Sequence, residues 1–366
     1  MEIIAKRYRP LVCMGSWVIT SHMGEIAMLN PVSKETKHIC NLPVKGAKLF
    51  LSKFRIMERL LRTEAKIAVP ISDNELIISF HGCIYNVDIA KGTIHPELTY
   101  RNGMNGPMRI VPIKGVSGFN DCLAFGEYTL NSQRKNPSAV FTRDYVTGKW
   151  KKAYEFVPGR VRHIHGLTPD PENGCVYILT GDFENEAGIW VAKNNFESVE
   201  PLLVGSQTYR SGYLFKTECG LIYATDTALE QNYLYCIFEG ENGKPDLKSF
   251  YEMDGSCVSS GETKDKVLFS STVEADESIR GWRSWINMKR GAGIKSEYAK
   301  LVAVNKSDLG VSVITQFKKD KLPFKLFQYG YMKVVDAPEL ESILVYPVGV
   351  KKFDATMLMI RYEEMK

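Results

Sequence analysis

The chain has 366 residues, of which 44% are hydrophobic and 24% charged, a composition typical of a folded globular protein that excludes a disordered or fibrous one. Lysine and arginine number 47 against 42 acidic residues, a surplus too small for a dedicated nucleic-acid-binding protein. The N-terminus lacks a signal-peptide pattern, and the eight cysteines are widely spaced without a CxxC pair. We therefore expect a cytoplasmic protein with reduced cysteines and no nucleic-acid partner.

Short runs of β-branched and aromatic residues, bounded by Gly, Asn, Asp or Pro, recur from one end of the chain to the other. They form seven pairs, each with an apolar strand, a polar hairpin and a second strand. The pairs begin at residues 17, 75, 122, 176, 221, 267 and 342. This spacing suits the ~40–50 residues of a β-propeller blade, with insertions in two places. The sequence predicts an all-β, seven-bladed propeller that occupies residues 1–366 as a single domain, with six blades as the alternative.

Three segments depart from the repeat. Residues 2–8, EIIAKRY, are predicted to complete the last blade by pairing with the C-terminal strands, because an open ring would leave an unpaired edge. Residues 48–62, KLFLSKFRIMERLLR, are either a short amphipathic helix or an extended strand. Residues 275–298 separate the two strands of the sixth pair and are too long for a hairpin, so we expect an insertion on the ligand-binding face.

Polar residues recur at the positions that surround one mouth of a propeller's central channel. The loops between blades and the loops between second and third strands emerge on that same face. Residues at the ends of second strands are His22, His81, Glu127, Asp182 and Asp226, and residues at the starts of inner strands are Arg62, Arg109, His163, His165 and Arg210.

His163 and His165 flank Ile164 in a predicted strand, so the two imidazoles point to the same side. Such a pair suits structural hydrogen bonding, proton transfer or substrate binding. A divalent metal held by the pair with a neighbouring carboxylate is a further alternative, although no cofactor is predicted. Asp182 and Asp226 each close a strand, where an aspartate either takes part in acid–base chemistry or only caps a turn.

Arg210 follows Gln207 and Tyr209 and precedes Tyr213, a setting that suits either a bidentate grip on a carboxylate or an ion pair between blades. The insertion carries Trp282, Arg283 and Trp285, and indole and guanidinium groups suit sugar rings and carboxylates. Three interpretations of the insertion stay open: a lid over an acidic glycan, a peripheral membrane contact through residues 280–290, or a segment packed against the blades.

Residues 160–230, with HIHGLTPDPENGCVYILTGD, GIWVAKNN, GSQTYRSGYLF and LIYATDT, resemble the sialidase-like propellers with BNR or Asp-box repeats. That family includes uncharacterised members linked to bacterial polysaccharide gene clusters. TRDYVTGKW matches an Asp-box with additional spacing through Thr142, Asp144, Gly148 and Trp150, and Phe54, Arg55 and Ile56 match the start of the family's FRIP-type segment. A weaker resemblance, in composition, is to propeller polysaccharide lyases, in which His, Tyr and Arg eliminate across a uronate.

These resemblances imply a carbohydrate-active propeller that acts on an anionic oligo- or polysaccharide, by hydrolysis or β-elimination, in bacterial surface-polysaccharide metabolism. A hydrolase would use Asp182 with Asp226 or Glu127. The alternative is a non-catalytic propeller that binds a glycan or a protein partner in such a pathway. The predicted catalytic residues are His163, His165, Asp182, Tyr213 and Asp226, and the predicted substrate-binding residues are Arg62, His81, Arg109, Glu127, Gln207, Tyr209, Arg210, Trp282, Arg283 and Trp285.

Overall fold

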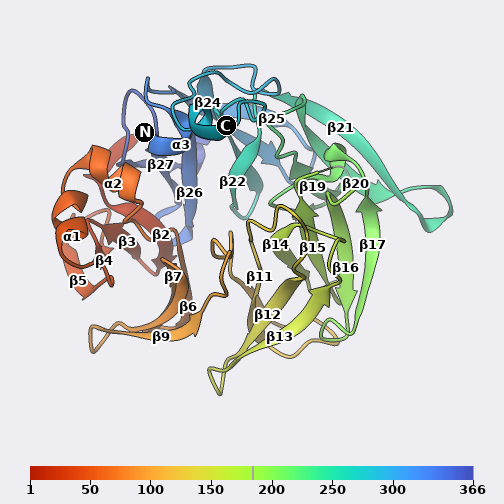
Figure 1. Ribbon diagram of the computed structural model, residues 1–366, viewed down its shortest axis with the longest axis horizontal. Coiled ribbons are helices and arrows are strands. Elements are labelled where there is room, and N and C mark those ends of the chain that lie inside the picture. The colour runs from red at the N-terminus through yellow and green to blue at the C-terminus, as the bar shows by residue number, and fades with distance from the viewer. Residues whose placement is uncertain (184, 366) are drawn as a thin grey trace.

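A computed structural model describes residues 1–183 and 185–365, and these residues form seven four-stranded antiparallel sheets arranged as a ring (Figure 1). Each sheet is one blade, and its strands run in chain order from the channel outwards, except in the last blade. The all-β, seven-bladed prediction is confirmed, and the six-bladed alternative is wrong. The repeat was visible in the sequence because every blade carries the same local pattern of strand, hairpin and strand.

The first four blades each consist of four consecutive strands. Blade one holds β2 (Arg9–Met14), β3 (Trp17–His22), β4 (Glu25–Leu29) and β5 (Thr36–Asn41). Blade two holds β6 (Ile67–Ser72), β7 (Glu75–Phe80), β8 (Cys83–Asp88) and β9 (Thr93–Thr99). Blade three holds β10 (Val111–Ile113), β11 (Cys122–Gly126), β12 (Ser138–Asp144) and β13 (Trp150–Phe156). Blade four holds β14 (His163–Asp170), β15 (Cys175–Gly181), β16 (Gly188–Lys193) and β17 (Ser198–Val204).

The ring is closed by pairing between the two chain ends. Blade five holds β18 (Phe215–Thr217), β19 (Gly220–Ala224), β20 (Asn232–Glu239) and β21 (Pro245–Met253). Blade six holds β22 (Cys257–Glu262), β23 (Lys266–Ser271), β24 (Tyr298–Asn305) and β25 (Val311–Lys318). Blade seven holds β26 (Tyr331–Ala337), β27 (Ser342–Val348) and β28 (Thr356–Arg361), and β1 (Glu2–Lys6) is its outermost strand. Glu2 lies opposite Met359 and Lys6 opposite Thr356, which confirms the predicted closure.

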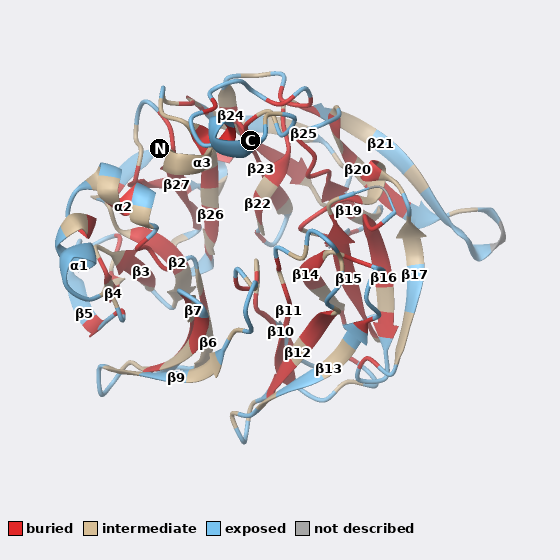
Figure 2. Cartoon of the chain, viewed as in Figure 1, coloured by how far each residue is buried: buried red, intermediate tan, exposed pale blue. Residues whose placement is uncertain are grey.

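The core lies between neighbouring blades, around the inner and middle strands (Figure 2). Every residue of β15 and of β27 is buried, whereas the outermost strand β17 has no buried residue. Phe156 of blade three and Trp190 of blade four pack edge to face across one such interface, with ring centroids 5.1 Å apart. The inner strands are thereby fixed on both faces, so they hold channel-facing side chains in defined positions.

Helices are few and short in the described residues. Residues 48–62 belong mainly to α1 (Ala47–Ser52) and α2 (Arg55–Leu61), so the helical interpretation is confirmed. Arg55, the arginine of the FRIP-like match, is paired with Asp354 at 2.9 Å and with Glu58 at 3.1 Å and therefore ties α2 to the last blade. No helix in the described part of the chain combines the length and the apolar character that crossing a membrane requires. The remaining helical segments are α3 (Phe324–Phe327) and the 3-10 turns η1 (Gln207–Tyr209), η2 (Glu241–Gly243), η3 (Gly281–Ser284), η4 (Pro338–Leu340) and η5 (Tyr362–Met365).

The insertion at residues 275–298 connects β23 to β24, as predicted. Its base is fastened by backbone hydrogen bonds, from Asp276 N to Lys289 O at 2.8 Å and from Gly291 N to Glu274 O at 3.2 Å. Its tip is exposed, since Trp282 keeps 70% and Trp285 55% of their surface accessible. The interpretation with both tryptophans packed against the blades is therefore wrong, because the segment is anchored by its backbone and not by its indoles.

Candidate functional site

Two buried imidazoles begin the inner strand of blade four. His163 Nδ1 lies 2.9 Å from the carbonyl oxygen of Thr129, and His165 Nδ1 lies 3.2 Å from that of Ser211. Because a carbonyl oxygen only accepts, each Nδ1 carries a hydrogen. Nε2 then offers a lone pair when the ring is neutral and donates a hydrogen bond, as toward Asp182, when the ring is protonated. The two Nε2 atoms are 3.1 Å apart. Gly181 leaves room for this arrangement, since a Cβ there would lie 2.6 Å from Cε1 of His165.

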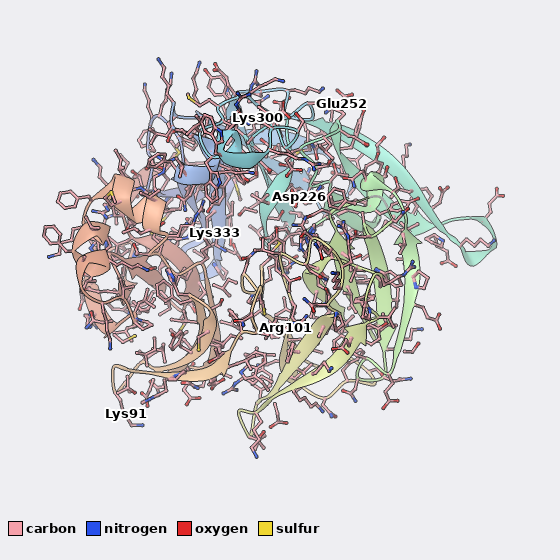
Figure 3. All side chains as sticks on the ribbon, in the orientation of Figure 1. Lys91, Arg101, Asp226, Glu252, Lys300 and Lys333 are labelled. Atoms are coloured by element: carbon pink, nitrogen blue, oxygen red, sulfur yellow. The ribbon has the colours of Figure 1, made fainter. Side chains whose placement is uncertain are left out.

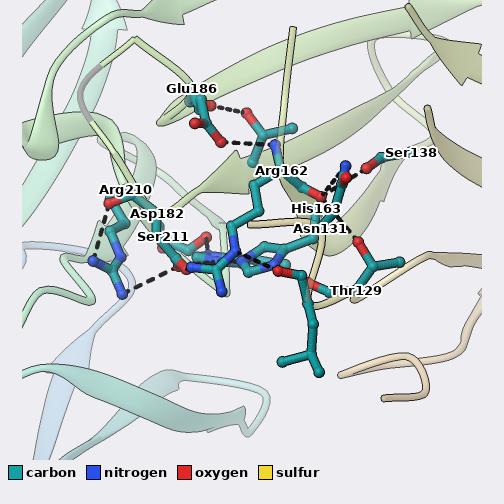
Figure 4. A network of polar contacts seen from close by, with 12 residues as sticks. Thr129, Asn131, Ser138, Arg162, His163, Asp182, Glu186, Arg210 and Ser211 are labelled. Carbon is teal, nitrogen blue, oxygen red and sulfur yellow. Dashed lines mark hydrogen bonds and ion pairs between the residues drawn. The ribbon is translucent and has the colours of Figure 1, made fainter. Parts of the chain in front are cut away.

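The carboxylate of Asp182, directly after β15, is contacted by both imidazoles and by two guanidinium groups (Figure 4). Its Oδ1 lies 3.1 Å from Nε2 of His163 and 3.1 Å from Nε2 of His165. Arg162 contacts Oδ2 at 2.8 Å, and Arg210 contacts Oδ1 at 3.2 Å. Burial opposes ionisation of Asp182, but the contacts with the two histidines outweigh it and hold the pKa of this carboxyl well below its usual range. Asp182 is therefore an anion at any physiological pH.

His163, His165 and Asp182 fit a divalent metal ion. Their ligand atoms all lie within 4.8 Å of one another. Atoms that bind one metal ion at about 2.0–2.2 Å are about 3 Å apart, which matches the contacts of 3.1 Å among these three groups. The carbonyl partners of both Nδ1 atoms fix the tautomer that metal coordination requires. Two imidazoles and one carboxylate are a donor set that zinc, manganese and iron accept.

A pair of buried acids lies on the other side of Arg210. Asp226 follows β19, and its backbone N–H donates to the Arg210 carbonyl at 3.0 Å. Glu274 follows β23 and accepts a hydrogen bond from the Ser256 hydroxyl. Burial raises the pKa of Asp226 despite the nearby Arg210. Burial and the charge of Asp226 raise the pKa of Glu274 to about 8, so near neutral pH Glu274 retains its proton.

Glu274, Arg162 and Tyr128 are members of the site that sequence reasoning missed. Glu274 follows the second strand of its blade, as Asp182 and Asp226 follow theirs, but it lies three residues beyond the strand end instead of one or two, so the repeat rule alone does not locate it. Tyr128 stacks on His163 with ring centroids 4.1 Å apart. The sequence did not predict that Tyr128 lies beside His163, because Tyr128 belongs to the irregular segment after β11.

Several predicted residues are brought into the cluster. His163, His165, Asp182, Arg210 and Asp226 meet as just described. Gln207 joins them, since its Nε2 donates to the Asp182 carbonyl at 2.8 Å.

Glu127 has a different environment from the one expected of a ligand-binding residue. It is 1% exposed, accepts hydrogen bonds from Arg101 and from the Ala139 N–H at 2.9 Å, and so holds blade three together. Both contacts engage the Glu127 carboxylate in the structure of the third blade and its approach.

The predicted residues His81, Arg62 and His22 make contacts within the protein away from the His163 cluster. His81 Nε2 lies 3.1 Å from the carbonyl oxygen of Arg62, and Arg62 donates to the carbonyl of Lys325 in α3 at 2.9 Å. His22 stacks on Tyr8, with ring centroids 3.9 Å apart.

The remaining predicted residues lie outside the His163 cluster. Tyr213, expected among the catalytic groups, stacks against the guanidinium of Arg109, which lies 4.4 Å from the centre of its ring. Tyr209 belongs to η1 and neighbours Tyr223 and Tyr235. Trp282, Arg283 and Trp285 are at the tip of the insertion, where the Arg283 guanidinium lies 5.9 Å from the Trp282 ring.

Comparisons with known proteins support the fold and assign no family. No protein-family model matches the chain, and no curated protein matches it. An oligogalacturonate lyase in complex with manganese superposes with a TM-score of 0.59 at 9% identity, over 98% of this chain and 91% of that one. The AfRom2 CNH domain superposes with a TM-score of 0.56 at 7% identity, over 98% of this chain and 97% of that one. A chain of the mitotic checkpoint complex superposes with a TM-score of 0.53 at 10% identity, over 98% of this chain and 92% of that one. Identities this low establish the propeller architecture alone.

Proposed function

We propose that this protein is a carbohydrate-active enzyme that cleaves a uronate-containing glycan by metal-assisted β-elimination. The observation that carries the proposal is the convergence of His163 Nε2, His165 Nε2 and Asp182 Oδ1 on one point beside two arginines. A metal site with neighbouring guanidinium groups suits a sugar that carries a carboxylate. The fold shared with an oligogalacturonate lyase in complex with manganese supports the same choice.

β-Elimination requires that the uronate carboxylate be neutralised, so that the proton on the adjacent ring carbon becomes acidic. A bound divalent metal would supply a positive charge to that carboxylate. Arg210 is 8% exposed and keeps its charge, since Asp226 and Asp182 offset its burial and raise its pKa. Its guanidinium is held against Asp182 through Nη1 and Nη2 and places a positive charge beside the substrate carboxylate.

Asp226 and Glu274 supply the proton transfers. Two acids that interact this closely share one proton near neutral pH. Asp226, beside Arg210, is the anionic member and accepts the proton from the ring carbon. Glu274 is the protonated member and donates its proton to the departing glycosidic oxygen. The carbon–oxygen bond breaks as a carbon–carbon double bond forms, so no water enters the product.

Hydrolysis with Asp182 as the general acid conflicts with the environment of this residue. A general acid must hold a proton at working pH, whereas two imidazoles and two guanidinium groups keep Asp182 ionised. Asp182 therefore does not fill the role of general acid that a hydrolase would require of it.

The test is to incubate the purified protein and Mn²⁺ with a panel of uronate oligosaccharides, beginning with oligogalacturonates, and to follow the ultraviolet absorbance of unsaturated uronate ends. We expect product that disappears on chelation and in the Asp182→Asn variant. Asp73→Asn, an exposed turn residue after β6, is the matched control and should retain activity. Oligosaccharide binding without product in every case would overturn the proposal and favour a non-catalytic glycan-binding propeller.

A further inference from the structure

The central channel is lined by positively charged side chains contributed by several blades. Arg9 lies at the start of β2 and Lys333 in the middle of β26. Lys66 precedes β6, and Arg109 precedes β10 by two residues. All four come from the innermost strand of a blade or from the residues that lead into it. Figure 3 shows Lys333 toward the middle of the ring, whereas Lys91 lies on its outer edge.

Among the described residues, Glu64 is the acid that pairs with this cluster, and Glu262 acts on Arg109 without forming an ion pair. Arg9 is 2% exposed, and its Nη1 lies 3.6 Å from Oε2 of Glu64. Glu64 is shared, since Arg55 contacts it at 3.4 Å and the Tyr346 hydroxyl donates to it at 3.1 Å. The Nε and Nη1 atoms of Arg9 are buried and have no hydrogen-bond partner. Glu64 therefore cannot neutralise the whole cluster.

Lys66, Arg109 and Lys333 form no ion pair with any acid in the described residues. Arg109 donates one hydrogen bond, to the Gly212 carbonyl at 3.3 Å. Arg9 contacts the Tyr331 hydroxyl, and Tyr331 lies two residues before Lys333 on β26, so the side chains of Tyr331 and Lys333 share one face of that strand. Burial and the charges of Arg9 and Arg109 lower the pKa of Lys333 to about 8. Lys66 is exposed and Arg109 and Lys333 are half-buried, and like charges gathered without a paired counter-ion repel one another.

Two tyrosines complete the channel wall. The Tyr331 hydroxyl accepts a hydrogen bond from Arg9 Nη2 at 2.8 Å, so its own hydrogen is free to be donated. Tyr213 stacks on Arg109 and keeps its guanidinium flat against the wall. The surroundings thus offer ammonium, guanidinium and hydroxyl donors around one space.

We propose that the channel binds an oxyanion group, a carboxylate, sulfate or phosphate, between Lys66, Arg109 and Lys333. The lysines supply point charges, Arg109 a planar pair of donors, and Tyr331 a hydroxyl donor. This site is separate from the His163 cluster, although Arg109 reaches the carbonyl of Gly212 and His165 that of the adjacent Ser211. The proposal does not rest on the enzymatic function, because it depends on the unpaired charges alone.

Isothermal titration calorimetry with inorganic phosphate and with a galacturonate trimer, at constant ionic strength set with chloride, tests the site. We expect one saturable site in the wild type and at least tenfold weaker binding in Lys333→Met, as loss of a charge-assisted contact implies. Lys352→Met, an exposed lysine of blade seven, is the control and should bind normally. Phosphate binding would identify a free anion as the ligand, and binding of the trimer alone would identify an acidic group of a glycan.

Thermal melting gives an independent reading of the same variants. Without anion, Lys333→Met should melt at a higher temperature than the wild type, because it removes repulsion with Arg9 and Arg109. Asp182→Asn should retain phosphate binding, which separates this site from the proposed catalytic one. Failure of both probes to bind the wild type, unchanged affinity in Lys333→Met, or a lower melting temperature of that variant without anion would overturn the proposal.

Discussion

Glu274→Gln should remove a pH-dependent loss of stability from the wild-type protein. The glutamine keeps the shape of the side chain and an oxygen that accepts from Ser256, but it cannot ionise. In the folded wild type the pKa of Glu274 is raised from 4.5 to about 8 by burial and by Asp226. A raised carboxyl pKa means that stability is fully present below pH 4.5 and is lost as the pH rises toward 8.

The size of this effect follows from the same values. The interval from 4.5 to about 8, at about 1.4 kcal/mol per pH unit, sets an upper limit of about 5 kcal/mol for the stability that Glu274 loses across it. Because Asp226 shares the proton, we expect a measured difference of about 2–3 kcal/mol between variant and wild type at pH 8 relative to pH 4.5.

The assay is urea unfolding of wild type and variant at a series of pH values between 4.5 and 8.5. We expect the free energy of unfolding of Glu274→Gln to exceed that of the wild type increasingly as the pH rises. Glu241→Gln, an exposed glutamate, is the control and should follow the wild type. Parallel pH profiles for Glu274→Gln and wild type would refute the assignment of Glu274 as a neutral buried acid.

Four further predictions concern the two sites and the insertion. Arg210→Lys should weaken binding of acidic oligosaccharides by about 1.5–3 kcal/mol in calorimetry and leave neutral ones unaffected, and equal affinity would contradict its role. His165→Gln should lower Mn²⁺ affinity at least tenfold by titration, and unchanged Mn²⁺ binding would exclude the metal site. Replacing both Trp282 and Trp285 by Ala should reduce glycan affinity without moving the melting temperature, because both indoles are exposed; a large fall in melting temperature would speak against this. Phosphate affinity should decrease as the pH rises through about 8, where Lys333 loses its charge, and a flat profile would argue against Lys333 as a ligand.

The fold could be predicted because each blade is formed by residues that are close together in the sequence. Each blade repeats a strand, a hairpin and a strand, and the N-terminal strand β1 has the apolar pattern of a partner for β28. Repeat position also placed His163, Asp182 and Arg210 on one face, because corresponding loops of a propeller emerge together.

Other parts of the site depended on distances that the repeat does not encode. Glu274 was missed because the insertion interrupts the sixth hairpin and hides the end of β23. Tyr213 was expected among the catalytic groups, yet it stacks on Arg109, a contact between residues of different blades that the repeat does not encode. Glu127 has the right repeat position but is bonded to Arg101, a partner from an irregular loop.

The central claim, elimination at a site built on His163, His165 and Asp182, is tested most directly by mass spectrometry of oligogalacturonate products formed in heavy-oxygen water with Mn²⁺ present. Elimination predicts one unsaturated fragment per cleavage, lighter than the hydrolytic product by the mass of a water molecule, and no heavy oxygen in either new end. The unsaturated fragment should be absent when Asp182→Asn replaces the wild type. Incorporation of heavy oxygen at the cleaved bond, or unsaturated product that persists in Asp182→Asn, would contradict the account.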